Sequence, residues 1–302
     1  MNPIFRATGL SKSFGKVRVL DGLDFEVPEG SIFGLIGPNG AGKTTTIKIL
    51  MNILQPTSGH AEVLGMDSRE LGPEALERIG YVSENQEMPG WMTVEYLMGY
   101  LKPFYPTWDD ARAKQLIDRF ELPPDRKLRH LSRGMMMKTA LAASLAYRPR
   151  LLVMDEPFSG LDPMVREELI EGLAASAGET TLFVSSHDLG EVESFATHIG
   201  YLDRGSLQIT EEMASLTARF RQIEVTVDTP FDAGGRWPAT WLRREATPSL
   251  VRFVDSQFHP ERTPSEIAHI FGAAVKTVSI QTMPLRTIFV TLSRQNDPRK
   301  SS

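Results

Sequence analysis

The sequence predicts an α/β protein with a mostly parallel β-sheet, followed by a small α+β domain. Two observations carry this prediction: short apolar runs alternate with helical patterns over the first two thirds of the chain, and the composition changes after about residue 219. Alternation of strands and helices is typical of a parallel sheet that is covered by helices. The length of 302 residues suggests about two domains.

The first domain, residues 1–219, contains three apolar runs that predict buried strands, at residues 31–36, 151–154 and 181–184. Apolar residues at helical spacing predict a helix over 45–54. A polar and apolar rhythm predicts a connecting helix over 163–175. These segments together indicate a doubly wound or phosphate-loop type of core.

Residues 85–135 differ from the segments around them because they are rich in Trp, Tyr, Met and Pro. Residues 111–120 have the spacing of an amphipathic helix. We therefore expect a mostly helical insertion between strands of the core.

The second domain, residues 220–302, alternates polar and apolar residues at 222–227 and, more weakly, at 250–254, which predicts strands. Thr263, Pro264 and Glu266 supply an N-cap, a first-turn proline and a carboxylate, so a helix should begin there. A last helix is expected from Leu285, and the tail from Gln295 is polar and expected to be disordered.

Composition excludes several classes of protein. Lys and Arg number 33 against 38 Asp and Glu, a formal net charge of −5, which disfavours a strongly basic nucleic-acid binder. The absence of cysteine excludes a disulfide scaffold, an iron–sulfur cluster and a Cys-ligated zinc site. No signal-peptide pattern is present, and no apolar run approaches the ~18 residues that a membrane span requires. We therefore expect a protein that is soluble by itself.

A phosphate-binding motif lies between the first predicted strand and helix. It consists of Gly37, Pro38, Asn39, Gly40, Ala41, Gly42, Lys43 and Thr44. In such a loop, backbone N–H groups surround the phosphates, the lysine neutralises the β- and γ-phosphates, and the threonine hydroxyl ligates magnesium. Thr45 joins the predicted nucleotide-binding residues. The alternative, a glycine-rich turn with a chance lysine, is disfavoured by the flanking strand and helix.

Two acids, Asp155 and Glu156, end the apolar run that begins at residue 151. A parallel strand delivers such carboxylates to the edge of the sheet where ligands bind. Asp155 can then hold magnesium, and Glu156 can polarise the water that attacks the γ-phosphate. The alternative, a pair of acids that only ends a strand, is disfavoured by the phosphate-binding motif.

Further motifs follow in a fixed order. Residues 131–135 read LSRGM, residues 159–162 read SGLD, His187 follows the strand predicted at 181–184, and Phe14 precedes them all. Together with the phosphate loop and the acidic pair, these residues resemble the ATPase subunit of a bacterial ABC (ATP-binding cassette) transporter over about residues 4–215.

The resemblance implies a role for each motif. Ser132 and Gly134 stand in the signature sequence, which binds the γ-phosphate held by the opposite subunit. Asp162 belongs to the loop that follows the acidic pair. His187 would bond the γ-phosphate and position the attacking water, and Phe14 would stack on adenine. The catalytic residues implied are thus Glu156, His187 and Lys43.

Two departures from the family pattern stand out. The signature sequence normally has glycine where this chain has Arg133, and glutamine where it has Met135. The glutamine that normally ligates magnesium is replaced by Glu84, so the predicted metal ligands are Thr44, Glu84 and Asp155. Gln86 would substitute only if the loop shifted by two residues. The three methionines at 135–137 point to different sides of a helix, so we expect them to pack rather than to bind metal.

The implied machine is a pair of subunits, identical or paralogous, that closes around two Mg-ATP and drives a separate membrane permease. It would lie at the cytoplasmic face of the inner membrane, attached through the permease, and the C-terminal domain favours an exporter. No nucleic-acid partner is expected. The alternative is a soluble ABC-type ATPase acting on nucleic acid or ribosomes; the single phosphate loop and the short spacing between Ser132 and Asp155 disfavour it.

Overall fold

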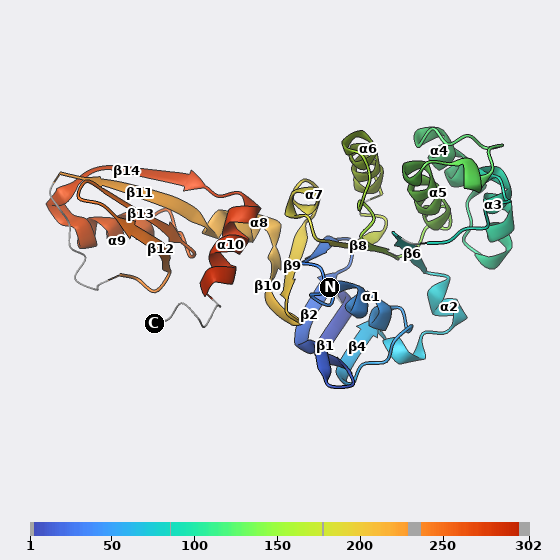
Figure 1. Ribbon diagram of the computed structural model, residues 1–302, viewed down its shortest axis with the longest axis horizontal. Coiled ribbons are helices and arrows are strands. Elements are labelled where there is room, and N and C mark those ends of the chain that lie inside the picture. Colours follow the sequence, from blue (N-terminus) through green and yellow to red (C-terminus); the bar gives the residue numbers. More distant parts are fainter. Residues whose placement is uncertain (1–2, 85, 177, 229–236, 296–302) are drawn as a thin grey trace. The chain divides into compact units, whose positions relative to one another are not determined.

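The computed structural model describes residues 3–84, 86–176, 178–228 and 237–295. It divides the chain into two compact units, Met1–Thr210 and Glu211–Ser302 (Figure 1). Each unit is described by itself. The boundary expected after residue 219 lies beyond this division, so that helix α8 (Met213–Arg219) belongs to the second unit.

The first unit contains an antiparallel sheet that the sequence patterns did not indicate. Its strand order is β2 (Val17–Pro28), β1 (Pro3–Phe14), β4 (Ser58–Val63) and β5 (Met66–Asp67). The register between β1 and β2 shifts at four places. Such irregularities interrupt the strict polar and apolar alternation by which a strand is recognised in a sequence.

The second sheet of this unit carries the predicted strands. Its order is β10 (Ser206–Glu212), β9 (His198–Asp203), β3 (Ile32–Ile36), β8 (Thr181–Ser186), β7 (Leu151–Asp155) and β6 (Ile79–Ser83). From β9 to β6 all neighbours are parallel. The predicted α/β class is therefore confirmed, with mixed rather than purely parallel sheets.

The parallel strands are buried on both faces. In β7, Leu152 and Met154 enter one hydrophobic core with the helical insertion, whereas Leu151 and Val153 enter a second core with the antiparallel sheet. This explains why β7 reads as a continuous apolar run, because successive side chains of a strand point to opposite faces.

Seven α-helices complete the described part of the first unit. They are α1 (Lys43–Leu50), α2 (Pro73–Leu76), α3 (Val94–Leu101), α4 (Asp110–Arg119), α5 (Arg133–Leu145), α6 (Pro163–Ala174) and α7 (Leu189–Glu193), with short 3₁₀ turns η1 (Ser68–Glu70), η2 (Lys102–Phe104) and η3 (Leu128–His130). Helices α3 and α4 lie within the insertion predicted over 85–135, whereas α5 continues ten residues beyond it. Figure 1 shows α3, α4 and α5 gathered together, and all three lie between β6 and β7 in the chain.

Two details of these helices bear on the sequence predictions. Helix α1 ends at Leu50, not at residue 54, because Asn52 takes a left-handed conformation with φ 57°. The expected packing role of the three methionines is confirmed: Met137 is buried, and Met135 and Met136 pack against the same core.

The second unit is built on one antiparallel sheet. Its order is β12 (Trp241–Ala246), β13 (Leu250–Asp255), β11 (Arg221–Val227) and β14 (Val275–Thr282), and its other elements are α8, α9 (Arg262–Phe271), η4 (Gly272–Ala274) and α10 (Leu285–Gln295). Ile267 and Phe271 of α9 pack with the sheet, where Trp241 stacks on Phe253 with ring centroids 3.9 Å apart.

The predicted strands β11 and β13 and the predicted helices α9 and α10 are confirmed, whereas β12 and β14 were not expected. The N-cap of α9 was predicted at Thr263, two residues after its actual position at Glu261. Thr263 lies within the helix. Its hydroxyl instead donates to the buried carboxylate of Asp255 at 2.6 Å. The tail predicted to be disordered, residues 296–302, lies outside the described residues.

Candidate functional site

The phosphate-loop motif connects β3 directly to α1. Gly42 precedes the helix with φ 113°, and a Cβ atom there would lie 2.4 Å from the Leu20 side chain, so only glycine fits. The backbone N–H of Ala41 donates to the carbonyl of Pro38 and closes the turn. The first backbone N–H groups of α1 have no acceptor within the helix, which makes this end a ready site for an anion.

Lys43 is buried at the start of α1, with 5% of its surface exposed. Its ammonium donates to the carbonyl oxygens of Gly37 (2.7 Å) and Pro38 (3.3 Å) and lies 3.0 Å from Oε1 of Glu156. A buried ammonium needs such partners because burial of an unpaired charge is costly. The ion pair therefore joins the phosphate loop to the acidic end of β7.

Asp155 lies buried at the end of β7 and accepts two hydroxyl hydrogen bonds at Oδ1. Thr44 donates from α1 at 3.2 Å, and Ser185 donates from the end of β8 at 2.7 Å. The Ser185 oxygen in turn accepts the backbone N–H of Glu156 at 3.0 Å. Three segments that are far apart in the sequence thus converge on one carboxylate.

Glu156 has a left-handed backbone with φ 53°, a conformation that is uncommon for a residue other than glycine. Its Oε2 accepts from the backbone N–H of His187 (3.3 Å) and lies 2.7 Å from the imidazole Nδ1. Burial alone would raise the pKa of this carboxyl, but hydrogen bonds from His187 and Lys43 outweigh burial and lower it below its ordinary value. Glu156 is therefore held as a carboxylate between the two.

Glu84, which directly follows β6, lies with a different set of partners. Its Oε1 accepts from Nη2 of Arg133 at 2.5 Å and from the hydroxyl of Ser159 at 3.0 Å. The carboxylate of Glu84 is thus paired with the signature segment in this structure. Its role as a magnesium ligand stays a prediction.

The remaining predicted residues occupy separate places. The hydroxyl of Ser132 accepts from the N–H of Met135 and caps α5, and a carboxylate oxygen of Asp162 does the same for α6 through Val165. A Cβ atom on Gly134 would lie 2.7 Å from Val165, so this glycine permits the close packing of α5 on α6. Phe14 ends β1 and is half exposed, with the Lys12 ammonium 5.1 Å from the ring centroid.

The contacts of two serines in this region were not expected from the sequence, although Ser159 belongs to the predicted SGLD motif. Ser185 links Asp155 to the backbone of Glu156, and Ser159 links Glu84 to the loop after β7. The signal for Ser185 was its position: β7 and β8 are adjacent parallel strands, and their carboxyl ends meet at the edge where ligands bind.

The oxygen donors in this region suit a magnesium ion that takes most of its other ligands from water and phosphate. The hydroxyl of Thr44 and the carboxylate of Asp155 are hard oxygen donors in mutual contact. Among the described residues, no three His, Cys, Asp or Glu side chains form a cage for a metal ion. Glu84, Asp155 and Glu156 are thus not gathered around one point. Magnesium, which commonly takes one or two carboxylates together with water and phosphate oxygens, fits this arrangement.

Comparison with known proteins agrees with this geometry. A family model described as "ABC transporter" matches residues 20–159. The chain is 30% identical over 222 residues to the ABC transporter ATP-binding protein YtrB of Bacillus subtilis, covering 73% of this chain and 76% of that protein. The chain belongs to the ABC transporter family of ATP-binding proteins. It therefore binds and hydrolyses ATP as an ABC ATPase.

Other members of the family have transport in their names. The bacitracin transport ATP-binding protein BcrA of Bacillus licheniformis is 33% identical, with 68% of this chain and 69% of that protein covered. The probable multidrug ABC transporter ATP-binding protein YbhF of Escherichia coli is also 33% identical, and this chain covers 41% of its length. The alternative of a soluble ABC-type ATPase acting on nucleic acid or ribosomes is not favoured by these relatives.

Solved structures show the same fold. An ATP-binding subunit of an ABC transporter superposes with a TM-score of 0.65 at 24% identity, covering 71% of this chain and 92% of that one. The ADP form of MJ1267, an ATP-binding cassette of an ABC transporter, gives 0.62 at 25% identity, with 72% and 96% covered. In the part of the ABC ATPase that the structure describes, no helix is long and apolar enough to cross a bilayer.

Replacing Lys43 by methionine should raise the pKa of Glu156. Burial raises this pKa, and in the variant only the hydrogen bond from His187 remains to lower it. A carboxyl whose pKa is lowered by folding stabilises the fold at pH values above its pKa in the unfolded chain. This contribution disappears as the pH falls through the pKa of the folded state. The variant should therefore lose less stability than the parent on acidification from neutral pH. Carbon-13 NMR titration of the Glu156 carboxyl measures the shift directly.

The matched control is Lys16→Met, which removes an exposed lysine from the turn between β1 and β2. It should leave the titration of Glu156 unchanged. An unchanged Glu156 titration in Lys43→Met would contradict the assigned ion pair.

Proposed function

We propose that this ABC ATPase powers transport through a separate membrane permease, by closing as a pair of subunits around two molecules of Mg-ATP. The observation that carries the proposal is the convergence of Lys43, Glu156 and His187 beside the Thr44–Asp155 contact. These side chains supply a cation for phosphate, a carboxylate for water and a hydrogen-bonding imidazole at one edge of the sheet.

The contacts of Lys43 suggest how the site responds to its substrate. A phosphate at the start of α1 would compete with Glu156 for the lysine ammonium, since both are anions and Lys43 is buried. Glu156 released from Lys43 keeps its hydrogen bonds from His187 and can orient water. Thr44 and Asp155 would hold magnesium, which when bound supplies charge neutralisation to the phosphate oxygens.

The signature residues support pairing of subunits. Ser132 begins the 13-residue helix α5, a place where a helix dipole and free N–H groups favour an anion. In the described structure, the contacts that gather Lys43, Asp155 and Glu156 do not include Ser132 or Gly134. A second subunit, identical or paralogous, would bring its own Ser132 and Gly134 to the phosphate held at Lys43.

Glu156→Gln should give an ATP-bound dimer that hydrolyses ATP at least about 100-fold more slowly than the parent, because an amide cannot polarise water as a carboxylate does. It also removes the anion that competes with phosphate for Lys43, so ATP should bind at least as tightly. Light scattering at high protein concentration, with Mg-ATP and with Mg-ADP, measures the association.

Glu171→Gln provides the control, because it changes an exposed glutamate of α6 in the same chemical way. It should behave as the parent in both assays. A Glu156→Gln protein that stays monomeric with Mg-ATP at high concentration, or that retains parental hydrolysis, would overturn the proposal.

The proposed docking surface for the permease is a row of exposed aromatic side chains on the helical insertion. Tyr96, Tyr100 and Phe104 repeat every four residues along α3 and η2, and Trp91 precedes them. All four are between 49% and 60% exposed, and the ring pairs Trp91–Tyr96 and Tyr100–Phe104 have centroids 5.4 and 5.6 Å apart. Such a concentration of exposed aromatic surface is typical of an interaction site.

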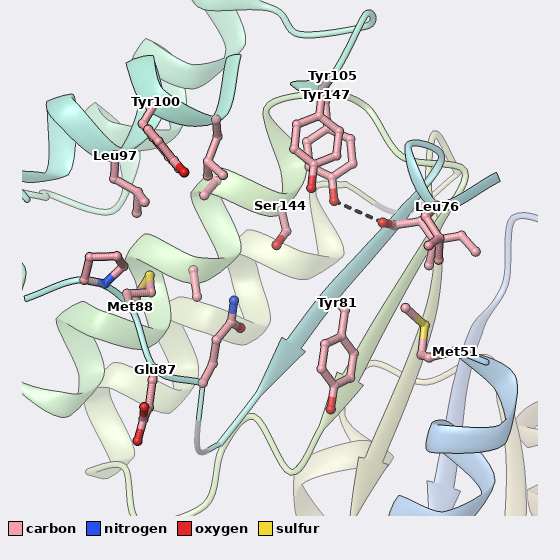
Figure 2. A pocket seen from close by; sticks show the side chains of 16 residues that line it. Met51, Leu76, Tyr81, Glu87, Met88, Leu97, Tyr100, Tyr105, Ser144 and Tyr147 are labelled. Carbon is pink, nitrogen blue, oxygen red and sulfur yellow. Dashed lines mark hydrogen bonds between the residues drawn. The ribbon is translucent and has the colours of Figure 1, made fainter. Parts of the chain in front are cut away.

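The aromatic row adjoins a groove of about 380 Å³, shown in Figure 2. Leu97 and Tyr100 of α3 line it together with Ser144 of α5 and Tyr81 of β6. Figure 2 also shows Tyr147, whose hydroxyl donates to the carbonyl of Ile79 at 3.1 Å and thereby ties α5's end to β6. A permease segment seated here would contact both the insertion and the core that carries the nucleotide residues.

The double variant Tyr96→Ser/Tyr100→Ser should lose at least about tenfold in affinity for the proposed permease, since aromatic anchors dominate such interfaces. Its ATPase activity as an isolated subunit should stay within about twofold of the parent. Co-purification from detergent-solubilised membranes measures binding, with Val278→Ser, an exposed apolar residue of β14, as the control. Undiminished binding by the double variant would exclude this surface.

Export is the direction of transport that we propose, with the protein held at the cytoplasmic face of the membrane through the permease. Relatives named for daunorubicin resistance and for bacitracin transport support this direction. We further propose residues 220–302 as an accessory domain for regulation or pairing, because every predicted nucleotide residue precedes them.

A further inference from the structure

The two departures from the family pattern, Glu84 and Arg133, contact each other. They lie 49 residues apart in the sequence, yet Nη2 of Arg133 is 2.5 Å from Oε1 of Glu84. Ser159 donates its hydroxyl to the same oxygen at 3.0 Å. We call these three residues the Glu84–Arg133 bridge.

The bridge joins the helical insertion to the segment that carries Asp155 and Glu156. Arg133 is the first residue of α5, and the backbone N–H of Glu84 donates to the carbonyl of Asp155 at 3.1 Å. The backbone N–H of Ser159 donates to the carbonyl of Glu156 at 3.2 Å. Arg133 is therefore connected to Glu156 and its neighbour Asp155 through two short chains of hydrogen bonds.

The guanidinium of Arg133 also lies against the backbone of this segment. A Cβ atom built on Gly160 would be 2.4 Å from Nη1 of Arg133, so the guanidinium occupies the space above a residue that has no side chain. Arginine suits this place because its planar group can pack on backbone and hydrogen-bond a carboxylate at the same time. A glycine at position 133, as in the usual signature sequence, could do neither.

The bridge also balances charge. Glu84 places a carboxylate where the family pattern has a neutral glutamine, and a nearby cation stabilises such a charged side chain. Arg133 supplies a cation directly on Glu84, whose side chain is 30% exposed. Glu84 without Arg133, or Arg133 without Glu84, would add an unpaired charge to this region. The pair together adds no net charge.

We propose that Arg133 is a positioning residue that acts within its own subunit: through the Glu84–Arg133 bridge it fixes the segment 155–160, and with it Glu156, relative to α5. Arg133 then does not serve as a phosphate ligand for the opposite subunit. The test of this proposal by ATPase activity rests on the proposed function. The test by hydrogen exchange without nucleotide does not.

The first test is a double-mutant cycle on the ATPase activity of the full chain. Arg133→Gly and Glu84→Gln should each lower kcat about tenfold, with KM for ATP within about twofold of the parent, because the contacts of Lys43 are with Gly37, Pro38 and Glu156. The double variant should again lose about tenfold and not about a hundredfold, since one bridge is removed in every case.

Two rescue variants show that the contact itself matters. Arg133→Lys keeps the charge and should stay within about threefold of the parent kcat. The exchanged pair Glu84→Arg/Arg133→Glu restores opposite charges in contact and should recover to within about threefold of the parent. The control pair, Arg6→Gln and Glu26→Gln, breaks a 2.7 Å ion pair of similar exposure in the antiparallel sheet and should change nothing.

The second test is amide hydrogen exchange of the full chain without nucleotide. The N–H groups of Ser159 and Leu161 donate to the carbonyls of Glu156 and Phe158. They should exchange about tenfold faster than in the parent in both Arg133→Gly and Glu84→Gln. The double variant should exchange at the same rate as either single variant. The exchanged pair should restore slow exchange.

The outcomes separate the possible failures. Multiplicative losses in kcat, no rescue by the exchanged pair and unchanged exchange without nucleotide would overturn the proposal and favour a contact of Arg133 with the opposite subunit. A parent protein without ATPase activity would contradict the proposed function instead, and the exchange experiment would still decide whether the bridge holds the segment.

Discussion

The contact between Lys43 and Glu156 is the interaction around which the first unit is organised. The ammonium is buried, so its charge has to be matched by the loop carbonyls of residues 37 and 38 and by a carboxylate. The edge of the parallel sheet, where β3 ends in the loop and β7 ends in the acids, brings these groups together although they are far apart in the sequence. At the same edge, Ser185 of β8 donates its hydroxyl to Asp155.

The rest of the unit can be understood as support for that edge. The central strands are apolar on both faces, and the two hydrophobic cores on either side fix them in place. Rigid strands allow Glu156 to be held at φ 53°, a conformation that a loosely packed chain would relax. His187 and Ser185 then lock the carboxylate and the backbone of Glu156 from β8 and the segment after it.

The sequence predicted what is encoded locally. The apolar runs of β3, β7 and β8 are short and continuous, and the phosphate loop and acidic pair lie at their ends, so both the sheet and the core of the site could be placed. The antiparallel sheet escaped prediction because bulges between β1 and β2 break the alternation of polar and apolar residues. The contact of Glu84 with Arg133 escaped because it joins residues 49 apart whose partners are set only by the packing of α5. Thr263 was assigned to a cap because its pattern fits one; the buried Asp255, which takes its hydroxyl, is recognisable only in the folded chain.

The exchange of Glu156 for phosphate at Lys43 is tested most directly by a crystal structure of the protein with magnesium and a non-hydrolysable ATP analogue. In that complex, Nζ of Lys43 should leave Glu156 and lie within hydrogen-bonding distance of phosphate oxygens, with the metal ion beside Thr44 and Asp155. Glu156 should keep its hydrogen bonds with His187. An analogue bound away from the start of α1, or a Lys43 that retains its contact with Glu156 while phosphate is bound, would contradict this exchange.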